Sequence, residues 1–198
     1  LGLTVPDKFY ELVKNNEEMY LFSPYSVERE YGVPFSYINI TEEYDNLVAN
    51  PNISKTKIKA RDLEEEISKL QQESGYPYVV NIDTANRSSA FDRKIIMSNL
   101  CSEILQPQTP SVLNDGQDYE VLGTDISCNL GSLNMVNLME AEDIGKTIRT
   151  ATRALTWVSD HSNIEAVPSV KNGNAKAHSI GLGLMGLASF FAMNHIEY

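Results

Sequence analysis

The stretch Ser98-Asn99-Leu100-Cys101-Ser102-Glu103-Ile104 places a thiol two residues after a carboxamide and two residues before a carboxylate. In an extended segment, side chains at i, i+2 and i+4 point the same way, so Asn99, Cys101 and Glu103 would share one face. On a helix, Cys101 would turn away from the other two. We therefore expect this stretch in a loop or a strand, with an amide, a sulfur and a base side by side.

The length, composition and net charge of the chain indicate a globular protein that does not bind nucleic acid non-specifically. Its 198 residues are enough for one good-sized domain, and 42% hydrophobic with 22% charged residues excludes a disordered chain. A net charge of −11 opposes non-specific binding to nucleic acid, which requires basic patches. No apolar stretch approaches the roughly 20 residues of a membrane span.

Two features of the chain indicate where it resides and what it was part of. Two cysteines are too few for a disulfide-built secreted fold, and the start lacks the layout of a signal peptide. We therefore expect a cytoplasmic protein with reduced thiols. The chain begins without methionine and ends directly after an apolar segment, which is typical of a piece of something longer.

The order of the expected elements favours an α/β fold with a mostly parallel sheet. Helical spacing predicts helices near residues 6–13, 41–49, 57–74, 144–158 and 184–193. Apolar runs predict strands over residues 19–27 (bent or ended at Pro24), 76–82, 124–130 (followed by a turn at Gly131) and 177–183. The connection over residues 83–118 reads as a long loop, and loops of that length are often functional.

A literal GxGxxG pattern lies at residues 181–186, after a strand-like stretch and before a helix. A dinucleotide site also needs an acidic residue about 20 positions later on another strand, and the chain ends before that point. The plainer interpretation is a glycine-lined strand end that lets a helix pack closely on the sheet, and we favour it.

The two cysteines leave several chemical interpretations open. Buried thiols acting as small apolar residues are common, whereas a nucleophile or a redox pair would also fit Cys101 in its polar loop and Cys128 27 positions later. His161, His178 and His195 show no metal-ligand spacing. Nothing beyond the residue types supports a papain-like cysteine–histidine pair.

Several motifs together resemble the large subunit of class I ribonucleotide reductase. The stretch at 98–104 is similar to the active-site loop of that family. Other matching motifs occur in the family's order at residues 21–24 (LFSP), 74–78 (SGYPY), 124–134 (TDISCNLGSLN) and 179–183 (SIGLG). Cysteine directly before Asn129 resembles the class Ib subgroup, and the likeness covers nearly the whole chain.

The resemblance implies a ten-stranded α/β barrel with an active-site finger loop between two five-stranded halves. This chain would be a partial arc of it. Residues 1–82 would end the first half-barrel, 83–118 would form the finger-loop region, and 119–198 would start the second half. Strand edges of such an arc remain unpaired until the full protein closes the barrel.

The same resemblance assigns a role to each site residue. Cys101 would carry a transient thiyl radical that takes the 3′ hydrogen of a ribonucleoside diphosphate, and Glu103 would act as general base for the 3′ hydroxyl. Asn99 would hold the sugar hydroxyls through its amide, within a substrate-binding loop that also includes Leu100, Cys101, Ser102 and Glu103. Cys128 would be one of two reducing thiols, with its partner upstream of this chain rather than at Cys101.

The implied partners are a radical-generating β subunit with a dimetal-tyrosyl centre, a thioredoxin- or glutaredoxin-like reductant, and a second copy of the full-length chain. The resemblance implies neither a metal nor a cofactor bound by this chain, and it puts ATP- or dATP-type effectors on parts of the parent protein outside it. The competing hypothesis is a non-catalytic nucleotide-binding module or thiol redox switch, which a Cys101–Cys128 disulfide that alters partner binding would favour.

Overall fold

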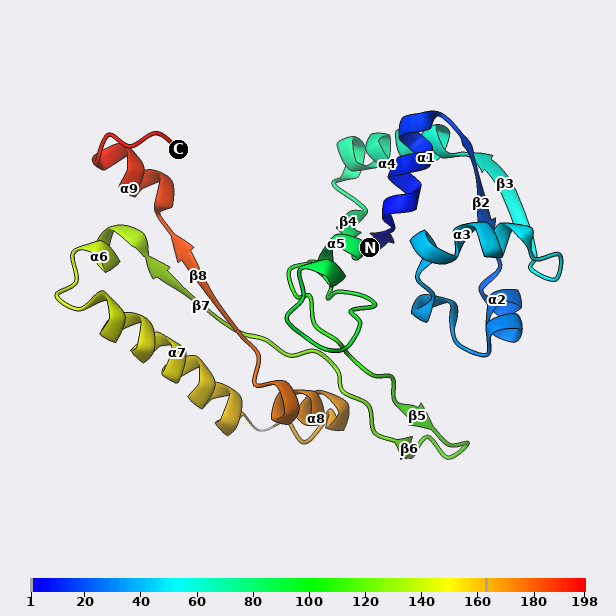
Figure 1. Cartoon of the computed structure of the whole chain (residues 1–198). Helices are drawn as coiled ribbons and strands as arrows, with labels where there is room; N and C mark the ends of the chain where they lie inside the picture. Colours follow the sequence, from blue (N-terminus) through cyan, green and yellow to red (C-terminus); the bar gives the residue numbers. More distant parts are fainter. Residues whose placement is uncertain (1, 163) are drawn as a thin grey trace. The chain divides into compact units, whose positions relative to one another are not determined.

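The computed structural model describes residues 2–162 and 164–198, and the chain forms two compact units (Figure 1). The first unit spans Leu1–Pro107 and the second spans Gln108–Tyr198. The boundary between them lies within the segment 83–118 that we assigned to the finger-loop region.

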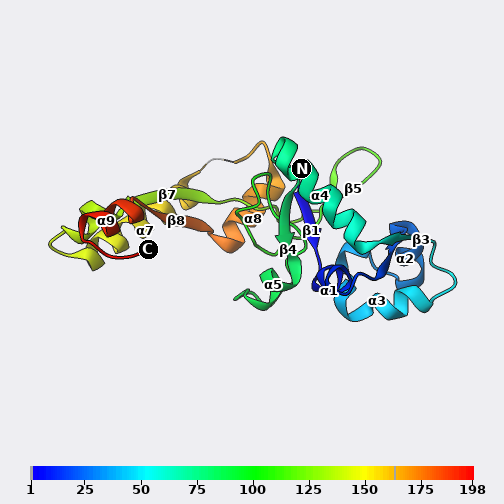
Figure 2. The same ribbon diagram turned by 90° about the horizontal axis from the view of Figure 1, so that it is seen from above.

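The first unit is built on two pairs of strands with helices packed around them. Its elements are β1 (Gly2–Val5), α1 (Asp7–Asn15), β2 (Glu18–Phe22), α2 (Pro24–Tyr31), the 3₁₀ turn η1 (Phe35–Tyr37), α3 (Ile40–Ala49), β3 (Lys55–Lys59), α4 (Ala60–Ser74), β4 (Tyr78–Asn81) and α5 (Ile82–Arg87). Strands β1 and β4 run parallel and lie side by side in Figure 2, whereas β2 and β3 are antiparallel. The core joins these elements through Val5, Phe9, Leu12, Met19, Tyr44 and Ala60.

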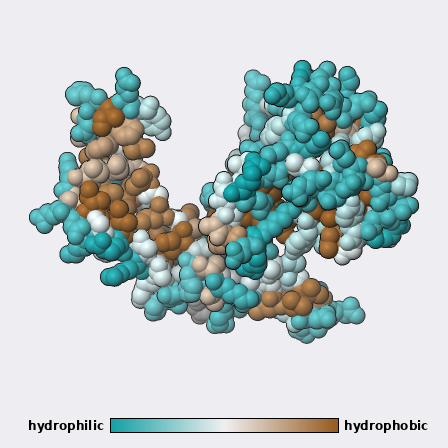
Figure 3. Space-filling model, in the orientation of Figure 1, coloured by the Kyte–Doolittle hydropathy of each residue, from teal (hydrophilic) through white to brown (hydrophobic). Residues whose placement is uncertain are grey.

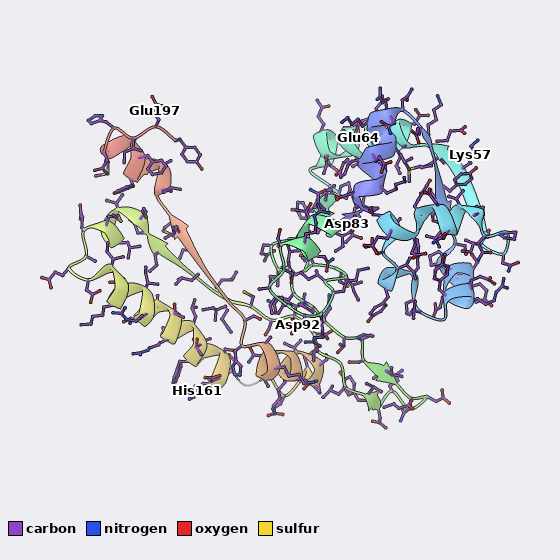
Figure 4. All side chains as sticks on the ribbon, viewed as in Figure 1. Lys57, Glu64, Asp83, Asp92, His161 and Glu197 are labelled. Atoms are coloured by element: carbon purple, nitrogen blue, oxygen red, sulfur yellow. The ribbon has the colours of Figure 1, made fainter. Side chains whose placement is uncertain are left out.

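A polar junction ties three helices of this unit together. One carboxylate oxygen of Asp83, at the start of α5, accepts hydrogen bonds from the Asp7 backbone N–H (2.8 Å) and the Thr41 hydroxyl (2.6 Å) (Figure 4). Because the N–H groups of the first helical turn have no partner within the helix, Asp83 caps α1 from a distant part of the chain.

Most expected elements of the first unit are present, with three differences. The strand expected over 19–27 ends at Phe22, because Pro24 occupies the first turn of a helix, where proline fits well. The helix expected from 57 begins at Ala60, because residues 55–59 pair with β2. The segment expected to be loop from residue 83 begins with α5.

The second unit contains a parallel strand pair with a long helix along one face. Its elements are β5 (Val112–Leu113), β6 (Tyr119–Val121), β7 (Asn129–Asn134), α6 (Met135–Met139), α7 (Ile144–His161), α8 (Pro168–Ala177), β8 (Ile180–Met185) and α9 (Leu187–Met193). Strands β7 and β8 pair in parallel, with Leu130 opposite Gly181. A Cβ placed on Gly131 would lie 3.4 Å from Leu155 Cδ2, so this face of β7 packs against α7 (Figure 1).

The second unit corrects three expectations. Residues 124–128 do not form the predicted strand, because this segment pairs with the start of α8 through the bond from Asp125 N–H to Ser169 O (3.1 Å). Gly131 lies inside β7 and not in a turn. The helix expected from 184 begins at Leu187, because β8 continues to Met185 and Gly186 turns the chain at φ +74°.

The described sheets are all two-stranded, so their outer edges are open. Apolar side chains accompany those edges: Leu130, Leu184 and Met185 of the β7–β8 pair are 63%, 57% and 53% exposed (Figure 3). This mixed α/β arrangement with unclosed sheets is what a fragment of an α/β barrel presents. Within the described residues, no helix is both long and apolar enough to cross a membrane.

Candidate active site

Cys101 lies in a tight turn of the first unit. The Ser102 N–H donates to the Asn99 carbonyl oxygen at 3.1 Å, which closes a four-residue turn with Leu100 and Cys101 at its centre. Ser102 adopts φ +64°, a left-handed conformation that is uncommon for a residue with a side chain. The expectation of a loop is confirmed, but the extended alignment of Asn99, Cys101 and Glu103 is wrong because the chain reverses between them.

The Asn99 side chain closes the base of this turn. Its Oδ1 atom accepts hydrogen bonds from the Ile104 backbone N–H (3.0 Å) and from the Ser98 hydroxyl (3.2 Å), while that hydroxyl also reaches the Ile104 carbonyl oxygen (2.7 Å). The Ile104 N–H fixes the amide orientation, because only Oδ1 can accept from it. No described residue accepts from the Nδ2 group, so it remains as a donor for something else.

The two reactive side chains of the turn are accessible. Cys101 is an exposed free thiol, and Glu103 is exposed as well. Among the described residues, none forms a hydrogen bond or an ion pair with either side chain. The Leu100 side chain between Asn99 and Cys101 is 80% exposed. The turn thus presents a sulfur and a carboxylate to solvent, and the Asn99 NH₂ group keeps its donors for another partner.

A second amide anchors the approach to the turn. Asn86 of α5 donates from Nδ2 to the Ile95 carbonyl oxygen (2.9 Å) and accepts at Oδ1 from the Ile95 N–H (2.8 Å). These two bonds satisfy both backbone groups of Ile95, as a neighbouring strand would do. The residue is also buried, with only 1% of its surface exposed. The loop therefore starts from a fixed point six residues before the thiol.

Two tyrosines lie near Cys101 within the first unit. The rings of Tyr76 and Tyr78 are 5.1 Å apart between centroids. The pKa of Tyr78 is raised, first by its hydrogen bond with Tyr76 and to a smaller extent by the negative charge of a Cys101 thiolate. Tyr78 also pairs with Gly2, and a Cβ on Gly2 would lie 3.6 Å from Ser102 Oγ. The turn is thus packed beside the β1–β4 pair.

Cys128 belongs to the second unit, immediately before β7, and is half-buried. Strand alternation puts it on the same face as Leu130 and Ser132, opposite the face of Gly131 that packs on α7. On the neighbouring strand, Gly181 lies against it: a Cβ there would be 3.3 Å from Cys128 Sγ.

Helix α8 holds the backbone that leads to Cys128. The Asn174 side chain is 7% exposed; its Oδ1 accepts from the Ser127 hydroxyl (3.1 Å) and the Ser159 hydroxyl (2.7 Å), and its Nδ2 donates to the Ser159 carbonyl oxygen (2.7 Å). Next to it, Gly173 approaches so closely that a Cβ would lie 1.9 Å from the Asp125 carbonyl oxygen. Glycine is required at that position by the close approach of the two backbones.

The structure corrects the interpretation of the GxGxxG pattern. Gly181 does not make room for a helix on the sheet, because its face carries Cys128 and Leu130. The glycine that lets a helix approach is Gly131, against Leu155. Sequence reasoning missed Gly173, Gly181 and the anchoring amides Asn86 and Asn174, because their roles depend on contacts that no local pattern signals.

Two of the histidines have partners within the second unit. His161, at the end of α7 (Figure 4), stacks on Trp157 with ring centroids 4.2 Å apart. His178 Nδ1 lies 2.8 Å from Asp160 Oδ1. No group of three or more His, Cys, Asp or Glu side chains that could hold a metal occurs in the part of the chain that the structure describes.

Comparison with known proteins identifies the family. The chain matches the family "Ribonucleotide reductase, barrel domain" over residues 1–198, and it belongs to that family. It is 49% identical to the ribonucleoside-diphosphate reductase subunit alpha of Mycoplasma pneumoniae over 199 residues, covering all of this chain and 28% of the relative. The corresponding subunit of Bacillus subtilis is 42% identical over 200 residues, with all of this chain and 29% of the relative covered. The chain therefore spans less than a third of the length of these relatives.

Proposed function

We propose that this chain is the catalytic core segment of a ribonucleoside-diphosphate reductase large subunit of the class Ib type. The observation that carries the proposal is the match of the whole chain to the barrel-domain family, together with the accessible thiol of Cys101 on its closed turn. The complete subunit would convert ribonucleoside diphosphates to 2′-deoxyribonucleoside diphosphates.

The reaction that we propose balances with two thiols. The substrate and a dithiol give the deoxynucleotide, a disulfide and water. Cys101, as a thiyl radical, takes the 3′ hydrogen atom and returns a hydrogen atom at the end. Cys128 and a partner thiol outside this chain supply two electrons and two protons. One proton leaves with the 2′ hydroxyl as water, and the other completes the new C2′–H bond as the disulfide forms.

Each side chain of the turn has a distinct task in this proposal. Glu103 takes the proton of the 3′ hydroxyl, a general-base role typically worth 10²–10⁴-fold in rate. Asn99 contributes only its Nδ2 donor to a sugar hydroxyl, because Oδ1 is already engaged by Ile104 and Ser98. Leu100 and Ser102 complete the turn that the substrate meets.

The complete protein would need partners for this chemistry. We propose a radical-generating β subunit, a ribonucleoside diphosphate substrate, and a thioredoxin- or glutaredoxin-like reductant that restores the dithiol. We further propose that the complete protein is a cytoplasmic homodimer, with effector sites outside the segment described here and no cofactor held by this chain.

Replacement of the thiol tests the proposal in the full-length subunit. With the β subunit and a dithiol reductant, Cys101→Ser should form no detectable deoxynucleotide, because an alkoxyl radical is not accessible where a thiyl radical is. Its thermal-unfolding midpoint should match the wild type, since Cys101 is exposed and packs into no core. Deoxynucleotide formation at more than a trace in Cys101→Ser would overturn the role proposed for Cys101, whereas a wild-type subunit that forms none would favour the thiol switch.

A carboxylate variant separates the base from the radical carrier. Glu103→Gln should lower turnover by about 10²-fold or more, the range for loss of a general base. Glu65→Gln on the exposed surface of α4 is the matched control and should leave turnover unchanged.

A further inference from the structure

Strand β8 contains two glycines, and an added Cβ would meet a sulfur at Gly181 but not at Gly183. It lies opposite Leu130 in the β7–β8 register. A Cβ built on it would be 3.3 Å from Cys128 Sγ, tighter than ordinary van der Waals contact, and 2.5 Å from Leu130 Cδ2. The absence of a side chain at position 181 therefore leaves room for the end of the Leu130 side chain and keeps a Cβ from crowding the Cys128 sulfur.

The two close contacts differ in how they can be relieved. Leu130 is 63% exposed and its Cδ2 is the end of a flexible side chain, so rotation moves it away. Cys128 has a short side chain, and α8 holds the backbone before it in place. Ser127 is hydrogen-bonded to the buried Asn174, and Gly173 lies directly against the Asp125 carbonyl. Any displacement by a few tenths of an ångström would therefore have to come from the sulfur itself.

We propose that Gly181 is a positioning residue for the Cys128 thiol, because its lack of a side chain lets that sulfur keep its place beside β8. This inference rests on the proposed function, in which Cys128 delivers reducing equivalents and then forms a disulfide. A disulfide requires the two Cβ atoms about 3.5–4.5 Å apart, so both the place and the accessibility of the sulfur are constrained. Gly181 acts through Cys128 and does not contact the substrate.

The same strand supplies a matched control. Gly183 is two residues further along β8, opposite Ser132 and on the same face as Gly181. A Cβ on Gly183 would meet Ser132 Oγ at 3.5 Å and the Gly131 carbonyl oxygen at 3.9 Å, both ordinary contacts. An alanine therefore changes backbone freedom equally at both positions, but crowds the thiol only at 181.

The experiment compares Gly181→Ala and Gly183→Ala in the full-length subunit with two readouts. The first is the rate of alkylation of Cys128 by iodoacetamide, measured by peptide mass spectrometry with Cys101 as the internal reference. The second is deoxynucleotide formation by the pre-reduced subunit with its β partner, analysed for kcat and KM separately.

We expect Gly181→Ala to slow alkylation of Cys128 about threefold or more, because access governs thiol reactivity, and to leave Cys101 unchanged. The value of kcat should fall about tenfold, since misplacing a reacting group by 1 Å can cost 10²-fold and the shift here is smaller. KM should stay within about twofold, a pattern that general damage to the strand would not give. Gly183→Ala should match the wild type in all readouts.

Leu130→Ala combined with Gly181→Ala keeps the experiment decisive if the single variant folds poorly. It removes the 2.5 Å clash with Leu130 and retains the contact with sulfur, and Leu130→Ala alone is its reference. Cys128 alkylation and kcat within twofold of this reference would overturn the inference, as would equal losses in Gly183→Ala. Alkylation of Cys128 could be slowed in Gly181→Ala while the wild-type subunit forms no deoxynucleotide. That result would support the positioning role of Gly181 and refute the proposed function.

Discussion

The two thiols of this chain are held in place in contrasting ways. The Cys101 turn is closed by residues close in sequence: Asn99 and Ser98 bond to Ile104, five and six positions away, and Asn86 to Ile95, nine positions away. The segment before Cys128 is fixed by partners much further along the chain, as in the bonds from Ser127 to Asn174 (47 positions) and from Ser169 to Asp125 (44 positions).

This contrast suggests which thiol depends on the rest of the fold. Local hydrogen bonds close small loops at little entropic cost, so the Cys101 turn can form from its own segment. The backbone before Cys128 becomes defined only after α8 has packed against it, and the room beside its sulfur exists only after β8 has paired with β7. Perturbing α8 should therefore affect Cys128 and spare Cys101.

Gly173→Ala should disturb the long-range contacts before Cys128 more than any other substitution that we propose. Its Cβ would lie 1.9 Å from the Asp125 carbonyl oxygen, and neither backbone can yield without moving α8 from the segment before Cys128. We expect a destabilisation of about 3 kcal/mol or more, at the upper end for overpacked sites. The checks are a lowered thermal-unfolding midpoint of the full-length subunit and faster alkylation of Cys128, with the alkylation rate of Cys101 unchanged.

Gly145→Ala is the matched control for that variant. Gly145 is also helical, but its added Cβ would meet the flexible end of Arg149 (3.0 Å) and the Oδ1 atom of the α7 N-cap Asp143 (3.3 Å), and no backbone atom. Alanine there should be neutral or stabilising by up to about 1 kcal/mol, from its better helix propensity. If Gly173→Ala changed the reactivity of both cysteines equally, the contrast between the local and the long-range arrangement would not hold.

Asn99→Asp sharpens the local side of the comparison. The carboxylate keeps an acceptor for the Ile104 N–H but removes the Nδ2 donor, so the turn should persist while the proposed substrate contact is lost. We expect catalytic efficiency to fall about tenfold, close to the value of one neutral hydrogen bond. The thermal-unfolding midpoint should remain that of the wild type.

Asn99→Ala supplies the complementary result. It removes the acceptor as well, so the Ile104 N–H loses its partner and should exchange its hydrogen with solvent faster than in the wild type and in Asn99→Asp. Equal protection of Ile104 in both variants would show that the Asn99 side chain does not close the turn. Catalytic efficiency in Asn99→Asp equal to that of the wild type would remove Asn99 from substrate binding.

The division between local and distant contacts also explains what the sequence could predict. The amphipathic helix α7 and the helix α4 with its stop at Gly75 follow from periodicity and capping, which are local signals. The loop that carries Cys101 was likewise predictable, because its polar residues and neighbouring prolines exclude regular structure. The tight turn within it was not, since it depends on which of several acceptors the Ile104 N–H finds.

The surroundings of Cys128 could not be predicted from the sequence. The segment 124–128 alternates polar and apolar residues as a half-buried strand does, but its backbone is bonded to α8, which no periodic pattern predicted. The glycine motif at 181–186 suggested either nucleotide binding or helix packing, whereas Gly181 faces a sulfur. The first outcome depends on the packing of α8, and the second depends on the register of β7 against β8, because a single strand does not encode its partner.

The smallest expected effect concerns Lys94, which lies where the Cys101 loop begins and tests the local contacts that hold this loop. Lys94 precedes the anchored Ile95, and its Nζ donates to the Tyr37 carbonyl oxygen at 3.3 Å. Burial lowers the pKa of Lys94 below its ordinary value of 10.5, although the carboxylates of Asp83 and Glu42 oppose this. The protonated amine of Lys94 therefore lowers the free energy of unfolding. This loss is complete below the pKa of the folded state, and it disappears as the pH rises through 10.5, the ordinary pKa of the unfolded state.

Lys94→Met removes this penalty, and its effect should depend on pH in a defined direction. We compare the thermal-unfolding midpoint of Lys94→Met with that of the wild-type full-length subunit. The variant's midpoint minus the wild-type midpoint should be highest near neutral pH and should fall as the pH approaches 10.5. At that pH only the loss of the hydrogen bond to Tyr37 should still separate the two proteins. Lys57→Met, at an exposed pair with Glu18 where the lysine pKa is raised, should give a difference that changes in the opposite direction. A difference for Lys94→Met that rises with pH would mean that the amine is stabilised in its charged form. The loop root would then depend on the charge of Lys94 as well as on the hydrogen bonds of Asn86.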